Sequence, residues 1–582
     1  MTRTYGCLQL VDGGTKWEMS KIEPHVAIRL KHLFPRVPKN STGPYYFPRD
    51  LAHAADLDWF ISRYPLFMSE GDRQALRGGR LAFEHEQAEL ERILLPDYSP
   101  PPMLGLRDGQ KIRLYQSQAV TLVQMRKSLL LGDEGGLGKT YVAGAFLAST
   151  PGALPAAVVC DPHMQKQWRD KLTTFTTLRV HVIKKASPYN LPPADVYIFR
   201  ISQIGGWIDF FNEGFFKAVV YDEPQSLRTG DQTAKGAAAR VLSNHTEYHL
   251  GLSATPVYGY GREIWQILSF IDADVLGTRE DFEREWLDDD GRINDPEALG
   301  TFLREQHVFL RRLKADVGLE LPKVSRIVEH VDFDAKAVQS IEELAKKLAI
   351  RATTGSFVER GAAVRELDMM VRQATGVSKA KSVAQFVRLM VEAGEPVLLA
   401  GWHREVYSIW QQELGDLRPA MYTGSESPTQ KEREKERFLN GDTDVMIISL
   451  RSGAGLDGLQ ERCSVLVIGE LDYSPGVHQQ LLWRIDREGQ KNPVIAFFLV
   501  SEEGSDPPIM DVLGIKASEA HHVVDPNLGV QQTDNDTSHL KRLVQHYLDK
   551  VNRRAKEDIA ADGGSKIMEP QTDRSEQQLL PI

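Results

Sequence analysis

The sequence is poor in cysteine and has no long apolar run. Its three cysteines (Cys7, Cys160 and Cys463) lie far apart, with no C-x-x-C pair and no histidine at ligand spacing. This argues against a disulfide framework and against a zinc site, and it fits a reducing compartment. No apolar run approaches the roughly 18 residues that a membrane helix needs. The N-terminal stretch MTRTYGCLQLVDGG also lacks the apolar core of a signal peptide. We therefore expect an intracellular, cytoplasmic protein with no membrane partner, nucleoid-associated if its source is prokaryotic or viral.

Length and charge limit the possible architecture. With 582 residues, a prior of about 150 residues per domain suggests three or four units. The formal net charge of −10 gives no basic field over the whole protein. Any surface that binds nucleic acid must therefore be a local patch of positive charge.

Strands and helices alternate in two long stretches. Within residues 109–330, the apolar runs SLLLGD, AAVVCD, DVYIFR, FKAVVYDE and YHLGLSAT alternate with helical patterns. A second alternation covers residues 379–530 and has no phosphate loop of its own. Such repetition predicts an α/β fold with two parallel sheets, each covered by helices on both faces. Ligands should bind outside the carboxyl ends of the strands.

The remaining segments have other patterns. Residues 1–98 resemble a separate, mostly helical accessory domain in which the pair Gly78-Gly79 breaks one helix from the next. Residues 331–378 have the pattern of a helical insertion. Residues 531–582 should form a C-terminal helix followed by a disordered tail.

The stretch LLLGDEGGLGKT joins an apolar strand to a helix through a glycine-rich turn. Glycines such as Gly136 and Gly138 let backbone N–H groups close around phosphate oxygens, and the helix N-terminus adds its dipole. Lys139 would then reach the β and γ phosphates of ATP, and the Thr140 hydroxyl would ligate Mg²⁺. Asp133 stands where the strict pattern G-x-x-x-x-G-K-[ST] has its first glycine. A glycine-rich helix start without a ligand is therefore the alternative.

Two further strand ends carry candidate chemistry. The run AVVY ends in Asp222 and Glu223, where one carboxylate can hold the hydration shell of Mg²⁺ and the other can orient and deprotonate water. A solvent-exposed acidic turn is the alternative. Ser253 and Thr255, in HLGLSATP, could bridge this acidic pair to a neighbouring surface, although a plain strand-to-turn assignment fits them equally well.

The second alternation supplies positive charge. In HQQLLWRIDREGQ, Arg484 and Arg487 are three positions apart and should lie on one face of a helix. Guanidinium groups suit a γ-phosphate, and an arginine finger is typically worth about 10³ to 10⁵ in rate. Solvent-exposed surface arginines are the alternative. Gln116, upstream of the loop in IRLYQSQAV, could bind both a donor and an acceptor of an adenine edge. By itself, however, Gln116 is simply a helix residue.

In these motifs the sequence resembles the Swi/Snf-type ATPases within the second superfamily of helicases and translocases. The resemblance runs from about Ile112 to Val500. It rests on IRLYQ, GDEGGLGKT, VVCDPHMQKQW, VVYDEPQSLR, LGLSATP, ISLRSGAGLDGLQ and QLLWRIDREGQ. The segment FLRRLKADVGLELPKV, at 309–324, looks like the signature that joins the two lobes in this family.

The resemblance implies two tandem RecA-like domains and an ATP site with Mg²⁺ between them. Carried over by position, it implies adenine recognition by Gln116, phosphate and magnesium binding by Lys139 and Thr140, metal ligation and base catalysis by Asp222 and Glu223, and completion of the site by Arg484 and Arg487. The sequence departs from the family pattern at Pro224-Gln225, Trp483 and Asp486. Because the charged groups are all present, these departures bear on coupling more than on ATP hydrolysis.

The implied function is a DNA-stimulated ATPase that moves along duplex DNA. Phosphate contacts would come from Ser202, Arg228, Arg451 and Ser452 at strand ends. No base-reading motif or stacking platform is evident, so binding should be sequence-independent. Protein partners could bind through the first 98 residues or the tail.

Two other functions remain open. The first is a helicase that separates strands of DNA or RNA. The second is a nucleotide-gated, nucleic-acid-binding subunit without turnover, which the DEPQ motif and Trp483 motivate.

Overall fold

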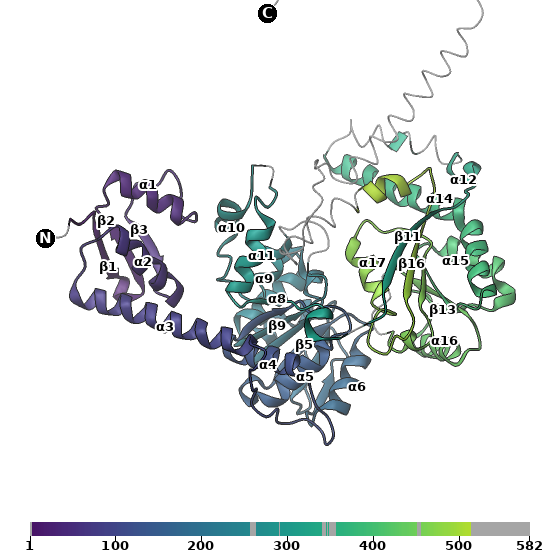
Figure 1. Cartoon of the computed structure of the whole chain (residues 1–582), viewed down its shortest axis with the longest axis horizontal. Helices are drawn as coiled ribbons and strands as arrows, with labels where there is room; N and C mark the ends of the chain where they lie inside the picture. The colour runs from purple at the N-terminus through teal and green to yellow at the C-terminus, as the bar shows by residue number, and fades with distance from the viewer. Residues whose placement is uncertain are drawn as a thin grey trace, which may run out of the picture.

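The computed structural model describes residues 3–256, 263–289, 291–319, 321–339, 357–450 and 456–511, together with positions 345, 347, 348 and 513. The C-terminal helix and tail expected at 531–582 lie outside this part of the chain. Figure 1 shows three bodies along the longest axis: an N-terminal unit, a first lobe and a second lobe. Within the described residues, no helix has the length and apolar character needed to cross a bilayer.

The first lobe is built on a seven-stranded sheet in the order β10-β4-β9-β8-β5-β7-β6, with every neighbouring pair parallel. Its strands are β4 (Ser128–Leu131), β5 (Ala156–Cys160), β6 (Val180–Val182), β7 (Val196–Arg200), β8 (Ala218–Asp222), β9 (Tyr248–Leu252) and β10 (Phe309–Leu310). Its helices are α4 (Leu114–Arg126), α5 (Lys139–Ser149), α6 (Gln165–Phe175), α7 (Ile208–Phe211), α8 (Ala234–Asn244), α9 (Glu263–Leu268), α10 (Arg279–Trp286) and α11 (Pro296–Glu305).

Both faces of this sheet are buried. Along β5, Val158 belongs to the apolar cluster that contains Phe146 and Trp168, whereas Val159 belongs to the cluster with Trp207 on the other face. Successive strand residues point to opposite faces, so the continuous apolar runs in the sequence are what a sheet covered on both sides requires. The five strands predicted in this lobe are confirmed. The short β6 and β10 were not predicted.

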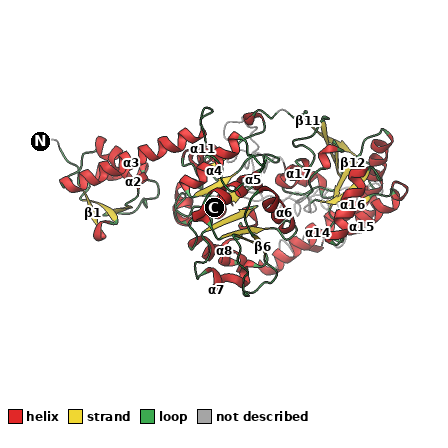
Figure 2. Ribbon diagram, turned by 90° about the horizontal axis from the view of Figure 1, so that it is seen from below, coloured by secondary structure: helices red, strands yellow, loops and turns green. Residues whose placement is uncertain are grey.

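The second lobe has a six-stranded sheet in the order β11-β16-β15-β12-β14-β13, again parallel throughout. Its strands are β11 (Val324–His330), β12 (Val397–Gly401), β13 (Ala420–Tyr422), β14 (Val445–Ser449), β15 (Val465–Ile468) and β16 (Val494–Val500). Its helices are α12 (Ala335–Gln339), α14 (Phe357–Glu392), α15 (Arg404–Glu413), α16 (Pro428–Asn440) and α17 (Pro475–Leu482). The predicted pair of RecA-like α/β domains is therefore confirmed (Figure 2).

Two predicted boundaries in this region are wrong. The first lobe was expected to extend to residue 330, but β11 pairs along its whole length with β16 of the second lobe. The connection between the lobes therefore lies between β10 and β11. The insertion was expected to end at residue 378, but α14 continues through that point without a break. Leu367 and Val371 are buried before that point and Val383 after it, so one continuous helix packs on the second lobe.

The N-terminal unit combines its helices with a small sheet that the sequence did not predict. Strands β1 (Cys7–Val11), β2 (Lys16–Ser20) and β3 (Tyr45–Pro48) form an antiparallel sheet, against which α1 (Pro24–Leu33), α2 (Leu51–Arg63) and α3 (Glu70–Leu94) pack. The strands are only four or five residues long, so their alternation was easily missed. Arg36 connects this unit to the first lobe, because its guanidinium donates to the Glu285 carboxylate at 2.8 Å and to the Val275 carbonyl at 2.9 Å.

The pair Gly78-Gly79 does not break a helix. Both glycines lie inside α3, which begins with the Ser69 side chain accepting from the Asp72 backbone N–H. A Cβ placed on Gly79 would lie 2.6 Å from the Ala54 Cβ of α2, whereas one placed on Gly78 would meet nothing within 4 Å. Gly79 therefore lets two helices approach closely, a role that a search for helix breakers does not reveal.

These adjacent glycines should respond to alanine with opposite signs. We expect Gly79→Ala to destabilise the N-terminal unit by about 1–3 kcal/mol, because the added methyl forces α2 and α3 apart. Gly78→Ala should stabilise it by about 0.5–1 kcal/mol through helix propensity alone. Native-state hydrogen exchange of the α3 amides measures both effects. Equal effects at the two positions would contradict the close helix packing.

Candidate nucleotide site between the two lobes

The phosphate loop is the segment from Gly132 to Gly138, between β4 and α5. Gly136 and Gly138 have φ values of +94° and +79°, a region that favours glycine. Lys139 begins α5, and its ammonium donates to the Asp133 carbonyl at 2.6 Å. Burial lowers the pKa of Lys139. The ammonium thus lies inside the loop, where a phosphate would accept its hydrogen bonds, and Thr140 follows in the first turn of α5.

Asp133, the residue that breaks the strict loop pattern, has a structural partner. Its carboxylate is fully buried and accepts from the Arg312 side chain at 3.0 Å (Nε) and 2.5 Å (Nη2), and also from the Arg312 backbone N–H at 3.1 Å. Arg312 lies in the connection between the lobes. The carboxylate at the first glycine position therefore ties the phosphate loop to the interlobe connection.

The predicted acidic pair lies at the carboxyl end of β8. Asp222 accepts from the Trp168 indole N–H at 2.7 Å, and burial, with a further contribution from Glu223, raises the pKa of Asp222. Glu223 adopts left-handed backbone angles of φ 56° and ψ 63°, which are uncommon for a residue with a side chain and occur often at functional sites. No separate signal in the sequence predicts the role of Trp168.

Of the two residues predicted to couple the acidic pair to another surface, Ser253 contacts Glu223 directly and Thr255 contacts Ser253. Ser253 donates to Glu223 Oε2 at 2.7 Å, and the Thr255 backbone N–H donates to Ser253 Oγ at 3.1 Å. Gln480 of the second lobe then donates to Thr255 Oγ1 at 3.1 Å. The same Oε2 accepts from Gln225 at 2.5 Å. A chain of hydrogen bonds therefore runs from the acidic pair to the second lobe.

Arg487 of the arginine pair reaches the phosphate loop, although not from a helix. The predicted helix ends at Leu482, and Arg484 and Arg487 occupy the turns after it. A Cβ placed on Gly135 would lie 2.4 Å from the Trp483 ring, and one placed on Gly136 would lie 3.2 Å from the Arg487 Cβ. The second lobe therefore packs directly on the loop, and two loop glycines permit that contact.

Arg484 is a half-buried cation whose guanidinium is not fully hydrogen-bonded. Its Nε has no hydrogen-bond partner among the residues that the structure describes. Burial and the neighbouring Arg487 lower the pKa of Arg484 to about 10, so it stays protonated at neutral pH. Burial and Arg484 together also lower the pKa of His163 to about 4. A desolvated guanidinium N–H without a partner favours an anionic acceptor, and a phosphate oxygen fits that requirement.

Arg487 is held by Asp457, a residue that the sequence did not single out. Its guanidinium donates to Asp457 Oδ1 at 2.6 Å, while Gln167 and Lys171 of the first lobe reach Asp457 Oδ2 at 2.6 and 3.2 Å. Lys171 and Arg487 hold the pKa of Asp457 far below its usual range. Asp457 therefore links the arginine to α6 across the cleft.

The remaining predicted residues support the phosphate loop, are exposed after strands of the first lobe, or lie outside the described residues. The Gln116 amide donates to the Leu137 carbonyl at 3.1 Å and accepts from the Arg113 backbone N–H at 2.9 Å. It thus supports the phosphate loop, and adenine recognition stays a prediction. Ser202 and Arg228 are exposed just beyond β7 and β8. Arg451 and Ser452 lie outside the described residues.

Comparison with known proteins gives one family match. The SNF2-related domain matches residues 58–381. A Caenorhabditis elegans homolog of SWI/SNF-related matrix-associated actin-dependent regulator of chromatin subfamily A-like protein 1 is 24% identical over 434 residues, which cover 69% of this chain and 61% of that protein. This chain thus spans less than two thirds of that relative. The uncharacterized ATP-dependent helicase YqhH of Bacillus subtilis is 20% identical over 498 residues, covering 78% of this chain and 85% of YqhH. The solved Sulfolobus solfataricus SWI2/SNF2 ATPase core in complex with dsDNA is 18% identical, with a TM-score of 0.38, and the match covers 74% of this chain and 96% of that one.

The buried pair of Asp133 and Arg312 yields a test. We expect Asp133→Asn to destabilise the first lobe by about 3–5 kcal/mol, because it leaves a buried guanidinium without its counter-charge. Asp195→Asn is the matched control, because Asp195 makes the same two-pronged contact with Arg179 at the surface and should change stability far less. Hydrogen exchange of the β4 and β9 amides reports both. Equal losses would show that burial of the pair is not what stabilises the loop.

Proposed function

This chain belongs to the SNF2-related family of helicase-like ATPases, and from that premise we propose that it couples ATP hydrolysis to movement along double-stranded DNA. ATP would draw the two lobes together, and hydrolysis would let them separate. Repeated closing and opening would step the lobes along the duplex. The double-stranded DNA substrate and the movement along it go beyond the family assignment.

The observation that carries the proposal is the contact between Arg487 and Gly136, residues from opposite lobes. A nucleotide seated in the phosphate loop of the first lobe would lie beside the guanidinium groups of the second. Such an arrangement would make the affinity between the lobes depend on the γ-phosphate, because a phosphate oxygen could accept from Arg484 Nε, which has no hydrogen-bond partner among the described residues. Loss of that phosphate on hydrolysis would then weaken closure.

Different residues of the first lobe would bind the phosphates and the magnesium ion. Backbone N–H groups at Gly136 and Gly138 and the Lys139 ammonium would hold the phosphates, while Thr140 and Asp222 would hold Mg²⁺. When bound, Mg²⁺ neutralises charge on the β and γ phosphates. These residues fit that group, since the site offers the Thr140 hydroxyl and the Asp222 carboxylate beside the Lys139 ammonium.

Glu223 would act as the base. Among the described residues, hydrogen bonds from Ser253 and Gln225 both reach Oε2, which leaves Oε1 to orient a water and accept its proton. Gln225 stands where a histidine is usual in the family, so this contact carries no charge that changes with pH. Through Ser253, Thr255 and Gln480, the state of the base would be felt in the second lobe.

DNA would be bound across the carboxyl ends of the strands in both lobes. Ser202 and Arg228 are exposed at that edge of the first sheet and would contact phosphates, with Arg451 and Ser452 supplying the second lobe. Contacts of this kind position the protein without reading bases. Binding should therefore be insensitive to sequence and should weaken as salt rises.

An ATPase assay on three variants tests the site. We expect Lys139→Ala to abolish nucleotide binding, and Glu223→Gln to bind ATP with no measurable turnover. Arg487→Ala should bind ADP normally but lose about 10³-fold or more in kcat, the usual effect of removing an arginine finger. Turnover that persists in Glu223→Gln would remove Glu223 as the base. Absence of turnover in the wild type with every polynucleotide would favour the nucleotide-gated binding subunit instead.

The choice of nucleic acid gives a second test. Duplex DNA should stimulate ATP hydrolysis more than single-stranded DNA or RNA does. The protein should also displace the third strand of a triplex without separating a plain duplex. Arg228→Ala should raise the duplex concentration needed for half-maximal stimulation and leave the rate without DNA unchanged. Preferential stimulation by single strands, with duplex unwinding, would assign the strand-separating helicase function.

A further inference from the structure

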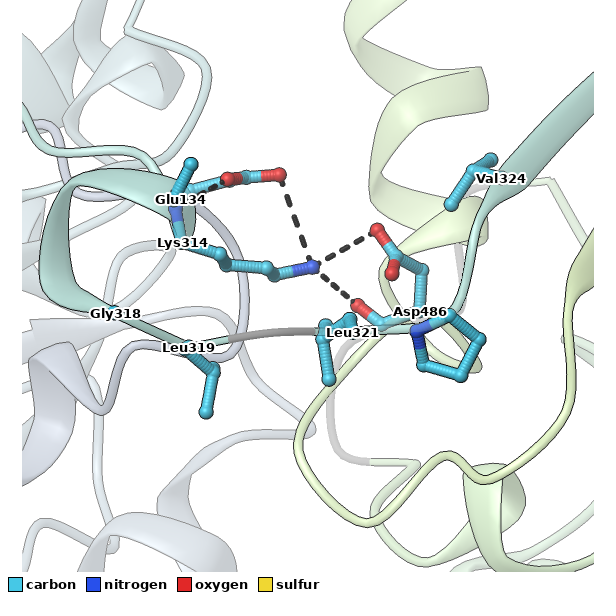
Figure 3. A pocket seen from close by; sticks show the side chains of 9 residues that line it. Glu134, Lys314, Gly318, Leu319, Leu321, Val324 and Asp486 are labelled. Carbon is cyan, nitrogen blue, oxygen red and sulfur yellow. Dashed lines mark hydrogen bonds and ion pairs between the residues drawn. The ribbon is translucent and has the colours of Figure 1, made fainter.

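A buried lysine joins the two lobes beside the arginine pair. Lys314 lies in the connection between β10 and β11 and is only 6% exposed. Its ammonium donates to the Asp486 carbonyl at 2.6 Å and to the Asp486 carboxylate at 2.8 Å, and it lies 3.7 Å from Glu134 Oε1. Figure 3 shows these contacts converging on one nitrogen.

The two carboxylates come from opposite sides of the cleft. Glu134 belongs to the phosphate loop of the first lobe, and Asp486 directly precedes Arg487 in the second. Glu134 also accepts from the Lys314 backbone N–H at 2.9 Å and from the Trp483 indole N–H at 3.3 Å. Without the ammonium, the buried Asp486 carboxylate and the half-buried Glu134 carboxylate would face each other across the interface with no counter-charge between them, which is unfavourable.

The lysine stem and Arg487 pack on the same glycine. A Cβ placed on Gly136 would lie 3.2 Å from the Arg487 Cβ and 3.8 Å from the Lys314 Cε. Because Lys314 also holds the backbone carbonyl of the residue before Arg487, its position determines where Arg487 meets the loop. The contact thus acts on the geometry of the arginine as well as on the affinity between lobes.

The ion pair between Lys314 and Asp486 is not enclosed by apolar side chains on all sides. The ion pair lies at the edge of a cavity of about 650 Å³, whose apolar lining includes Leu319, Leu321 and Val324. The connection therefore spans an open space at this point, and charged groups join the lobes there. Figure 3 shows these apolar side chains beside the ion pair.

We propose that Lys314 is a positioning residue that fixes the register in which the second lobe closes, and so places Arg487 over the phosphate loop. The inference rests on the proposed function, because it assumes that this closed arrangement is the hydrolytic one. Lys314 contacts neither ATP nor the attacking water in this account. Its effect is transmitted through Asp486 and Gly136.

Kinetics on Lys314→Met test the proposal. We expect kcat for DNA-stimulated hydrolysis to fall by about tenfold or more, as a misplaced catalytic group generally produces. The affinity for a fluorescent ADP should change little, because the first lobe alone holds ADP. Asp486→Asn added to Lys314→Met should restore part of kcat by removing one of the opposed carboxylates. Lys323→Met, an exposed lysine of the same connection, is the matched control and should behave as wild type.

A distance measurement tests the role of Lys314 independently of ATP hydrolysis. Spin labels at Asn212→Cys and Gln411→Cys, exposed positions in the two lobes, with Cys7→Ser, report the interlobe distance in the presence of a non-hydrolysable ATP analogue. Lys314→Met should broaden or lengthen the distribution. If the wild type has no turnover, the proposed function fails, and this distribution alone decides the role of Lys314.

Two results would overturn the role of Lys314. One is a Lys314→Met variant whose kcat and distance distribution match those of the wild type. The other is a parallel loss of ADP affinity and kcat, since Lys314 would then merely support the phosphate loop. If Lys314→Met does not fold, the same kinetic and distance measurements are made on Asp486→Asn alone. This variant keeps the lysine and removes the carboxylate that it binds.

Discussion

The structure depends on one close contact, in which the turn after α17 packs on the phosphate loop. The Trp483 ring covers Gly135, and Arg487 lies against Gly136. A side chain at either loop position would push the second lobe away. Glycine therefore serves two purposes here, because it frees backbone N–H groups for phosphate and admits the partner lobe. Binding of nucleotide and closure of the lobes consequently share the same few atoms.

The connection between the lobes is part of the site rather than a passive linker. Arg311 donates to the carbonyls of Gly132 and Ala254, Arg312 neutralises the buried Asp133, and Lys314 reaches across to Asp486. Three basic side chains within four positions thus bind the phosphate loop, the end of β9 and the second lobe. Such buried charges tolerate removal of one partner poorly, so the connection stabilises the relative arrangement of the lobes that the structure shows.

Much of the fold followed from apolar runs ending in functional residues, as in β4, β8 and β9. What the sequence could not reveal depends on distant partners. Asp133 and Arg312 are 179 positions apart. No local pattern predicts that the carboxylate at this glycine position will bind Arg312. The strand β11 is largely exposed, so its pattern does not say which sheet it joins. The pairing of β11 with β16 shows that β11 belongs to the sheet of the second lobe. Arg487 lies against Gly136 of the loop, but the helix expected to carry Arg484 and Arg487 ends earlier, at Leu482.

The central claim is that a triphosphate held by the first lobe is also held by the second. A structure with a non-hydrolysable ATP analogue and Mg²⁺ measures this directly through the distance between the γ-phosphate oxygens and the two guanidinium groups. The account predicts hydrogen bonds from Arg484, and from Arg487 once it is released from Asp457. A bound analogue with no contact to either arginine, and with Arg487 still paired to Asp457, would contradict it.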